Sequence, residues 1–77
     1  MRLNIKYFGL LAEVTGHHEE ALDFSGSTIS ELLDHLHEKY AGLENKDFQV
    51  AQNHEIVTGD ALVSDTEIAL LPPFSGG

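Results

Sequence analysis

The chain has 77 residues, with 13 acidic and four basic side chains, and its formal net charge is −9 at pH 7. This charge argues against a nucleic-acid partner, because binding to phosphates needs clustered lysine and arginine. The absence of cysteine excludes disulfides, thiolate catalysis and cysteine-ligated metals. No apolar run approaches the ~20 residues of a membrane-spanning helix, and the N-terminus lacks a signal-peptide core, so we expect one small cytoplasmic domain without membrane contacts. The acidity would favour docking on basic protein partners, or would simply keep the chain in solution.

The first part of the chain predicts two strands joined by a short helix. Residues 2–7 alternate between apolar and polar side chains, as a strand with one buried face does. Residues 9–16 begin and end with glycine and carry apolar side chains at helical spacing, which indicates one or two helical turns. A second strand is expected over residues 18–24, with Leu22 and Phe24 on one face, before a turn of serine and glycine.

The strongest helix signal spans residues 28–40. Thr28 and, three residues later, Glu31 fit a capping box, in which each side chain bonds to a free backbone N–H of the first turn. Five apolar side chains fall within an arc of roughly 100°, the width of a stripe that faces a core. These are Ile29, Leu32, Leu33, Leu36 and Tyr40. Polar residues occupy the other side of this helix, and Gly42 is placed to end it.

The second half of the chain predicts three more strands. Residues 48–52 and 56–57 are joined by a turn at Asn53-His54-Glu55, and residues 67–71 form the last strand. A connection through a helix favours a right-handed crossover between parallel strands, so we expect the first and last strands side by side at the sheet centre. The sequence therefore predicts an α+β domain over residues 1–71, in which a mixed sheet packs on one main helix.

The last six residues, Pro72-Pro73-Phe74-Ser75-Gly76-Gly77, are expected to form a flexible, extended arm over residues 72–77. Each proline fixes φ and lacks an N–H, so the sheet ladder ends there. Six residues can span ~20 Å at about 3.3 Å each, enough to reach a buried site in a neighbouring protein. The two glycines keep the end of the arm narrow. Phe74 is either an anchor in a partner or a side chain that folds back onto its own sheet.

Two segments of the sequence resemble a known family. The ending over residues 67–77, Glu-Ile-Ala-Leu-Leu-Pro-Pro-Phe-Ser-Gly-Gly, resembles the C-terminus of the small subunit of molybdopterin synthase. Residues 3–16 resemble the first strand and short helix of the same subunit, which is a ubiquitin-like sulfur carrier of the MoaD/ThiS family. The resemblance covers the whole chain at matching length, and its specificity lies mostly in the Pro-Pro-x-x-Gly-Gly ending. It implies a ubiquitin-like β-grasp fold.

The resemblance also implies chemistry at the C-terminal carboxylate. A carboxylate is a poor electrophile, and joining it to AMP from ATP supplies a leaving group that a sulfur nucleophile displaces. By resemblance, a ubiquitin-activating-type adenylyltransferase would activate Gly77, where a thiocarboxylate would form, and Gly76 would give clearance. The carrier would then donate sulfur to a pterin precursor on the large subunit of molybdopterin synthase. This implies a non-catalytic sulfur-donor subunit rather than an enzyme by itself, with no bound cofactor and with ATP used by the activating partner.

Partner contacts are expected along the last strand and the arm. Residues 68–71 are apolar on both faces, so one apolar face is left over once the helix covers the other. Whichever of Ala69 and Leu71 points outward should contact the large subunit. The expected partner-binding residues are Ala69, Leu71, Pro72, Pro73, Phe74 and Ser75.

The histidines do not indicate a metal site. His17 and His18 are neighbours in an extended segment and point to opposite faces, and His35 and His37 are about 200° apart on a helix, so neither pair converges. Two other functions stay open. One is a carrier of sulfur for thiamine or another sulfur metabolite, against which the Pro-Pro pair argues. The other is a ubiquitin-like modifier that is joined to lysines of target proteins.

Overall fold

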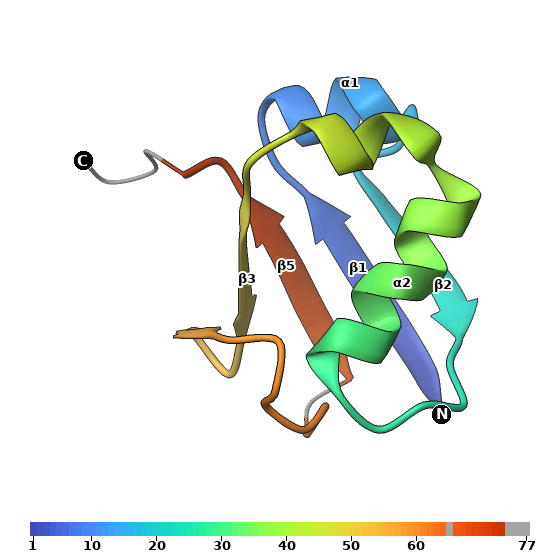
Figure 1. Cartoon of the computed structure of the whole chain (residues 1–77), viewed down its shortest axis with the longest axis vertical. Coiled ribbons are helices and arrows are strands. Elements are labelled where there is room, and N and C mark those ends of the chain that lie inside the picture. Colours follow the sequence, from blue (N-terminus) through green and yellow to red (C-terminus); the bar gives the residue numbers. More distant parts are fainter. Residues whose placement is uncertain (65, 74–77) are drawn as a thin grey trace.

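The computed structural model describes residues 1–64 and 66–73, which form a five-stranded sheet with one main helix across a single face (Figure 1). The strand order in the sheet is β2-β1-β5-β3-β4. The elements are β1 (Arg2–Tyr7), α1 (Leu10–Thr15), β2 (Glu19–Asp23), α2 (Ile29–Lys39), the 3₁₀ helix η1 (Ala41–Asn45), β3 (Gln49–Gln52), β4 (Glu55–Val57) and β5 (Glu67–Leu71). The predicted α+β architecture, a mixed sheet with one main helix, is confirmed.

The first and last strands lie side by side at the centre of the sheet. β1 and β5 run parallel, with Ile5 opposite Ile68 and Tyr7 opposite Leu70. β2 pairs antiparallel with β1, and β3 pairs antiparallel with β5 and with β4. The predicted parallel pairing is therefore confirmed, and the predicted bounds of the last strand match those of β5.

The core lies between α2 and the inner face of the sheet. Ile29, Leu32 and Leu36 of α2 have no exposed surface, and neither have Ile68 and Leu70 beneath them in β5. The apolar stripe predicted for this helix is thus confirmed at its centre. Leu33 and Tyr40 are only partly buried, and Tyr40 lies one residue beyond the end of α2.

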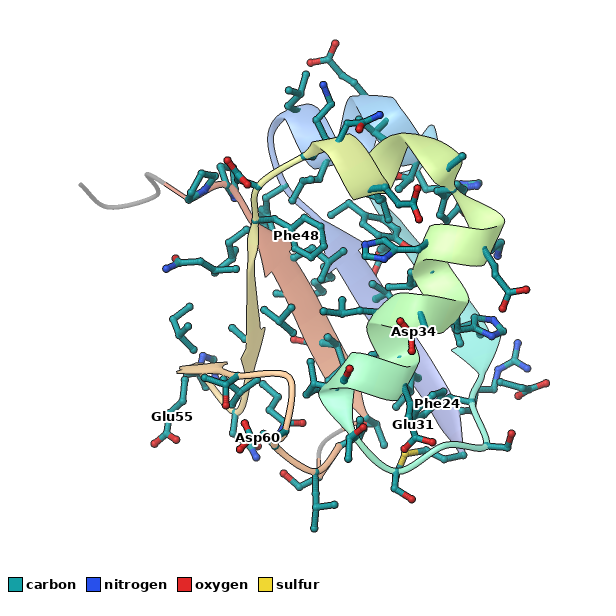
Figure 2. All side chains as sticks on the ribbon, viewed as in Figure 1. Phe24, Glu31, Asp34, Phe48, Glu55 and Asp60 are labelled. Atoms are coloured by element: carbon teal, nitrogen blue, oxygen red, sulfur yellow. The ribbon has the colours of Figure 1, made fainter. Side chains whose placement is uncertain are left out.

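The start of α2 is held in two ways. The predicted capping box is present: the Thr28 hydroxyl accepts a hydrogen bond from the Glu31 N–H at 3.2 Å, and the Glu31 carboxylate accepts one from the Thr28 N–H at 3.0 Å. The Ile29 N–H also donates to the carbonyl oxygen of Ala61 at 2.9 Å, from the loop that precedes β5. Figure 2 shows Glu31 at this end of α2, with Asp34 further along its solvent-facing side.

The other end of α2 differs from the prediction. The helix ends at Lys39, the next residue Tyr40 is extended at φ −129°, and Gly42 lies inside η1 rather than ending α2. A methyl group on Gly42 would lie 3.0 Å from Cγ1 of Val14, so this glycine permits close contact with α1. The prediction of Gly42 as the helix terminator is wrong, and η1, with its fully buried Leu43, was not predicted.

The turn between β3 and β4 follows the prediction. Asn53 and His54 both have positive φ, at 54° and 62°, as a tight two-residue hairpin turn requires. Glu55 belongs to β4 rather than to the turn. The hairpin places Ala51 opposite Ile56, and these two residues reappear below on the outer face of the sheet.

Candidate functional site

The strand that leads to the arm is held on both edges. β5 pairs with β1 on one side and with β3 on the other, and Leu71, its last residue, is opposite Gln49. The Phe8 N–H extends the ladder beyond β1 by donating to the carbonyl oxygen of Leu70 at 3.1 Å. The arm therefore starts from a fixed position at the centre of the sheet, at the end where α1 and η1 also lie (Figure 1).

Alternate residues of β5 face opposite sides of the sheet. Ile68 and Leu70 are fully buried beneath α2, whereas Ala69 and Leu71 are on the outer face and partly exposed. The prediction that β5 has two apolar faces, one of which is outside the core, is consistent with this alternation. Contact of Ala69 and Leu71 with a partner stays a prediction.

Further apolar residues extend this side of β5 across the sheet. Ala69 is opposite Ala51, which is opposite Ile56, and the Ile56 side chain is 54% exposed. Phe8 continues the alternation of β1 after the buried Tyr7 and is 45% exposed. We call this set the apolar outer face: Phe8, Ala51, Ile56, Ala69 and Leu71.

The neighbouring part of the same sheet face, on β1, β2 and the first residue of β5, is polar. Cross-strand pairs there join Arg2 to Asp23 at 3.3 Å, Lys6 to Glu67 at 3.5 Å and Asn4 to Glu19 at 2.9 Å. Exposed pairs of this kind stabilise a fold by about 0–1 kcal/mol each. Their main consequence is that the boundary between charged and apolar surface runs along the two central strands.

A groove lies beside the first two residues of the arm, Pro72 and Pro73, which we call its root. Its volume is about 270 Å³, and it is lined by Leu10, Leu11, Asn45, Lys46, Asp47, Pro72 and Pro73. We call it the arm groove. Across the root, Gly9 packs directly on Pro72: a methyl group on Gly9 would lie 2.9 Å from Cγ of that proline. Gly9 also has φ 59°, so both its conformation and this contact suit glycine.

The structure places only part of the predicted arm. Pro72 is partly buried and Pro73 is exposed. Phe74, Ser75, Gly76 and Gly77 lie outside the described residues. The predicted anchor at Phe74 and the predicted reactive end at Gly77 therefore stay predictions.

A hydrogen-bonded carboxylate joins the C-terminal end of α2 to the sheet. Glu20 of β2 accepts hydrogen bonds from the Tyr7 hydroxyl at 2.7 Å, the Tyr40 hydroxyl at 2.5 Å and the Lys39 ammonium at 2.5 Å. Burial by itself would raise the pKa of Glu20, but the hydrogen bonds from Lys39 and the two tyrosines outweigh it, so the pKa is lowered. Burial and the bond to Glu20 raise the pKa of Tyr7. The arrangement is structural, because its polar groups satisfy one another.

Two of the histidines, His17 and His37, contact aromatic rings. The ring of His17 is edge-on to Tyr40, and that of His37 is edge-on to Phe48, each with centroids 6.3 Å apart. Figure 2 shows Phe48 beside α2, just before β3. Over residues 1–64 and 66–73, no three histidine or acidic side chains are grouped so that they could hold a metal ion. The same residues contain no helix with the length and apolar character needed to cross a bilayer.

Sequence reasoning missed several residues of this site. Phe8 was available from the pattern, because extending the alternation of residues 2–7 by one position places it outward. No pattern in the sequence indicates the arm groove or the contacts of Glu20. They combine residues that are far apart in the sequence, and only the packing of α1, η1 and β5 at one end of the sheet brings them together.

Known proteins resemble this chain over its whole length. The molybdopterin synthase sulfur carrier subunit of Caenorhabditis elegans is 36% identical over 81 residues, which cover 97% of this chain and 96% of that protein. Small archaeal modifier protein 1 of Haloferax volcanii is 34% identical over 84 residues, covering 94% and 97%. The crystal structure of that modifier protein superposes with a TM-score of 0.81 at 29% identity, over 100% of both chains.

The structural likeness confirms the predicted ubiquitin-like β-grasp fold. The family match begins in β1 and continues through the last residue of the arm. It covers residues 5–77 under the description ThiS family. The chain therefore belongs to the ThiS family of sulfur carriers.

Proposed function

We propose that this protein is the sulfur-carrying small subunit of a molybdopterin synthase, and that Gly77 is adenylated and then thiocarboxylated. The observation that carries the proposal is the Pro72-Pro73 and Gly76-Gly77 ending, which lies inside the family match. The relative from C. elegans, at 36% identity, is named as a molybdopterin synthase sulfur carrier subunit. By resemblance, the Pro-Pro pair also favours this function over a carrier for thiamine synthesis.

The chemistry needs only the end of the chain and a partner that uses ATP. The Gly77 carboxylate attacks the α-phosphate of ATP, releasing pyrophosphate and forming an acyl adenylate. A sulfur nucleophile supplied by a donor then attacks the carbonyl carbon, and AMP leaves. Because the chain has no cysteine, no side-chain thiol is available to hold a persulfide, and the sulfur has to be bonded to the terminal carbonyl.

The fold would contribute two things: a fixed starting point for the arm and a surface on which the partner docks. β5 is paired on both edges, so the arm is presented from one defined point of the domain. The apolar outer face begins at that point with Leu71 and Phe8, and an apolar surface next to a functional segment is typical of a protein interface. We propose that the large subunit covers this face while it encloses residues 72–77.

A reconstituted reaction tests this function. The full chain is incubated with ATP, the activating enzyme and a sulfur donor, and the thiocarboxylated product is passed to the large subunit with the pterin precursor. We expect sulfur to move from the carrier to the pterin in amounts that match the carrier consumed. Thiocarboxylate that forms but is never consumed by the large subunit would contradict the molybdopterin assignment and leave the sulfur-carrier assignment standing.

Protein modification is the second candidate function. It is favoured by the 34% identical relative from H. volcanii, which is named a modifier protein and whose crystal structure has the same fold. An amine in place of the sulfur nucleophile would give an isopeptide bond at Gly77. Expression of the tagged chain in its native cell should then give larger covalent adducts on a denaturing gel, and these should be absent when Gly77 is deleted.

A further inference from the structure

The amines of this chain are not equally available. The N-terminal amine donates a hydrogen bond to a backbone oxygen at 2.9 Å. The Lys6 ammonium lies 3.5 Å from Glu67, and the Lys39 ammonium lies 2.5 Å from Glu20. The bond to Glu20 raises the pKa of Lys39, which disfavours its neutral form. For each of these amines, nucleophilic attack requires the loss of an existing contact.

Lys46 differs from the other two lysines. Among the residues that the structure describes, its side chain has no ion pair and no hydrogen bond. It is partly exposed and lies just after η1, on the wall of the arm groove. Asp47 also lines this groove and forms no ion pair with Lys46.

The groove suits a peptide like the arm itself. Leu10 and Leu11 of α1 and the two prolines give it apolar walls, and Leu10 is 52% exposed. The arm of another copy offers an apolar Pro-Pro-Phe segment of matching character. Three further residues of that arm span ~10 Å at about 3.3 Å each, so its terminal carbonyl reaches the amine at the groove wall.

We propose that Lys46 is a modification site of this protein: its amine accepts the C-terminal acyl group of a second copy, whose Pro-Pro-Phe segment binds in the arm groove. The product is two copies linked by an isopeptide bond between Gly77 and Lys46. The inference rests on the proposed activation of Gly77, which supplies the acyl donor.

The reaction balances without an oxidant or reductant. The neutral Lys46 amine attacks the carbonyl carbon of the activated Gly77, a C–N bond forms, and the bond from that carbon to the leaving group breaks. With the acyl adenylate the leaving group is AMP, and the proton lost by the amine goes to water. ATP is the co-reactant consumed in the activation step.

A second copy is a better donor than the arm of the same molecule. The two prolines fix consecutive φ angles, and the residue before a proline is held extended. Pro72 and Pro73 of the same molecule already line the arm groove, so they cannot also fill it as the bound segment. A separate arm can enter the groove in an extended conformation.

A thioester of the full chain tests the proposal without any enzyme. The donor carries a C-terminal thioester at Gly77, made by intein cleavage, and the acceptor is the isotope-labelled full chain with a free carboxylate. Intact mass separates the two copies, and peptide fragmentation locates the new bond. We expect most of the adduct at Lys46. In the acceptor, Lys46→Arg should slow adduct formation about fivefold or more, whereas Lys6→Arg and Lys39→Arg should change it less than about twofold.

A matched pair of charge variants tests the groove. Leu10→Asp adds one negative charge inside it, and Leu62→Asp adds the same charge at a side chain that is 67% exposed and not part of the groove. We expect only Leu10→Asp to slow acylation of Lys46, about threefold or more. Both positions are exposed, so neither change should unfold the domain, and a circular dichroism melt checks this.

Several outcomes would overturn the inference. These are an even distribution of adducts over the three lysines and the N-terminus, an unchanged rate with Lys46→Arg, and a product joined within one copy. They are separable from failure of the proposed function. If thiocarboxylation proceeds while Lys46 shows no preference, only the modification site is lost. If Lys46 is acylated by the thioester but the activating enzyme does not adenylate the chain, the proposed function is lost; the preference for Lys46 then stands, but without the acyl donor that this function would supply.

Discussion

The two faces of β5 have nearly the same composition and opposite surroundings. Ile68 and Leu70 face α2 and have no exposed surface, whereas Ala69 and Leu71, one position away, stay partly exposed on the outer face. A single helix can cover only one face of a sheet, so the apolar residues on the other face contribute less to folding. The comparison indicates that one strand has a buried face that stabilises the domain and a partly exposed apolar face, which we propose as the docking surface.

The largest effect on folding is expected at the centre of the covered face. Leu36→Ala leaves a cavity beneath α2, and we expect a loss of about 2–5 kcal/mol in the free energy of unfolding, measured by urea denaturation. Leu62→Ala, at a side chain that is 67% exposed, is the control and should cost less than about 0.5 kcal/mol. Equal losses at the two positions would mean that α2 does not provide the core.

A smaller effect is expected at Glu20, at the margin of the covered face. Glu20→Gln removes the charge that Lys39 and the two tyrosines bond to, and we expect a loss of about 1–3 kcal/mol at pH 7. Because the pKa of Glu20 is lower folded than unfolded, its contribution is present above the unfolded value of 4.5 and is lost as the pH falls through the folded pKa.

Urea midpoints measured from pH 7 down to about pH 3 check this sign. The parent protein should lose stability over this range, and Glu20→Gln should lose less. Glu31→Gln is a useful second variant, because backbone and hydroxyl hydrogen bonds at the capping box lower the pKa of Glu31 in the same direction. A pH dependence that is identical with and without Glu20 would contradict the assigned role of its hydrogen bonds.

The smallest effect on folding is expected on the outer face, where the effect on binding should be large. Ala69→Asp places a charge in the apolar outer face, and Ala21→Asp places the same charge on the outer side of β2, in the charged part of the sheet. We expect each to cost at most about 1 kcal/mol of folding free energy. Binding to the large subunit, measured by calorimetry, should weaken about tenfold or more for Ala69→Asp and less than about twofold for Ala21→Asp.

An affinity of Ala69→Asp that is unchanged from the parent protein would remove the apolar outer face as the docking surface. Equal loss in both would instead point to a general effect of added negative charge, which a titration at higher salt would expose. The pair therefore separates a local apolar contact from long-range electrostatics.

Most correct predictions of the fold came from patterns of residues that are close together in the sequence. The capping box of Thr28 and Glu31, the turn at Asn53 and the extent of β5 each depend on neighbours in the chain, and each was predicted correctly. Gly42 shows the limit of this reasoning. A glycine after a helix is typical of a terminator, but here it makes room for Val14 of α1, which no local pattern reveals.

In the candidate site, too, local patterns predicted some residues, and others are brought together only by tertiary packing. Ala69 and Leu71 could be named because strand alternation is local, although which of the two faces is covered depended on the fold. The arm groove could not be predicted, because Leu10, Lys46 and Pro72 meet only through packing. The reactive end is a different case: its chemistry was inferred from Gly76-Gly77 by resemblance to the family, and it needs no structure of the arm.

The central claim is that sulfur is bonded to the carbonyl carbon of Gly77, and mass spectrometry of the intact chain tests it most directly. After incubation with ATP, the activating enzyme and a sulfur donor, we predict a mass increase equal to the exchange of one oxygen for one sulfur, located by fragmentation at the last residue. Deletion of Gly77 should abolish the increase and leave the melting temperature unchanged, because the last residues of a domain usually contribute little to its packing. Sulfur at any other position, no mass change in the intact chain, or an unaltered reaction after the deletion would contradict the account.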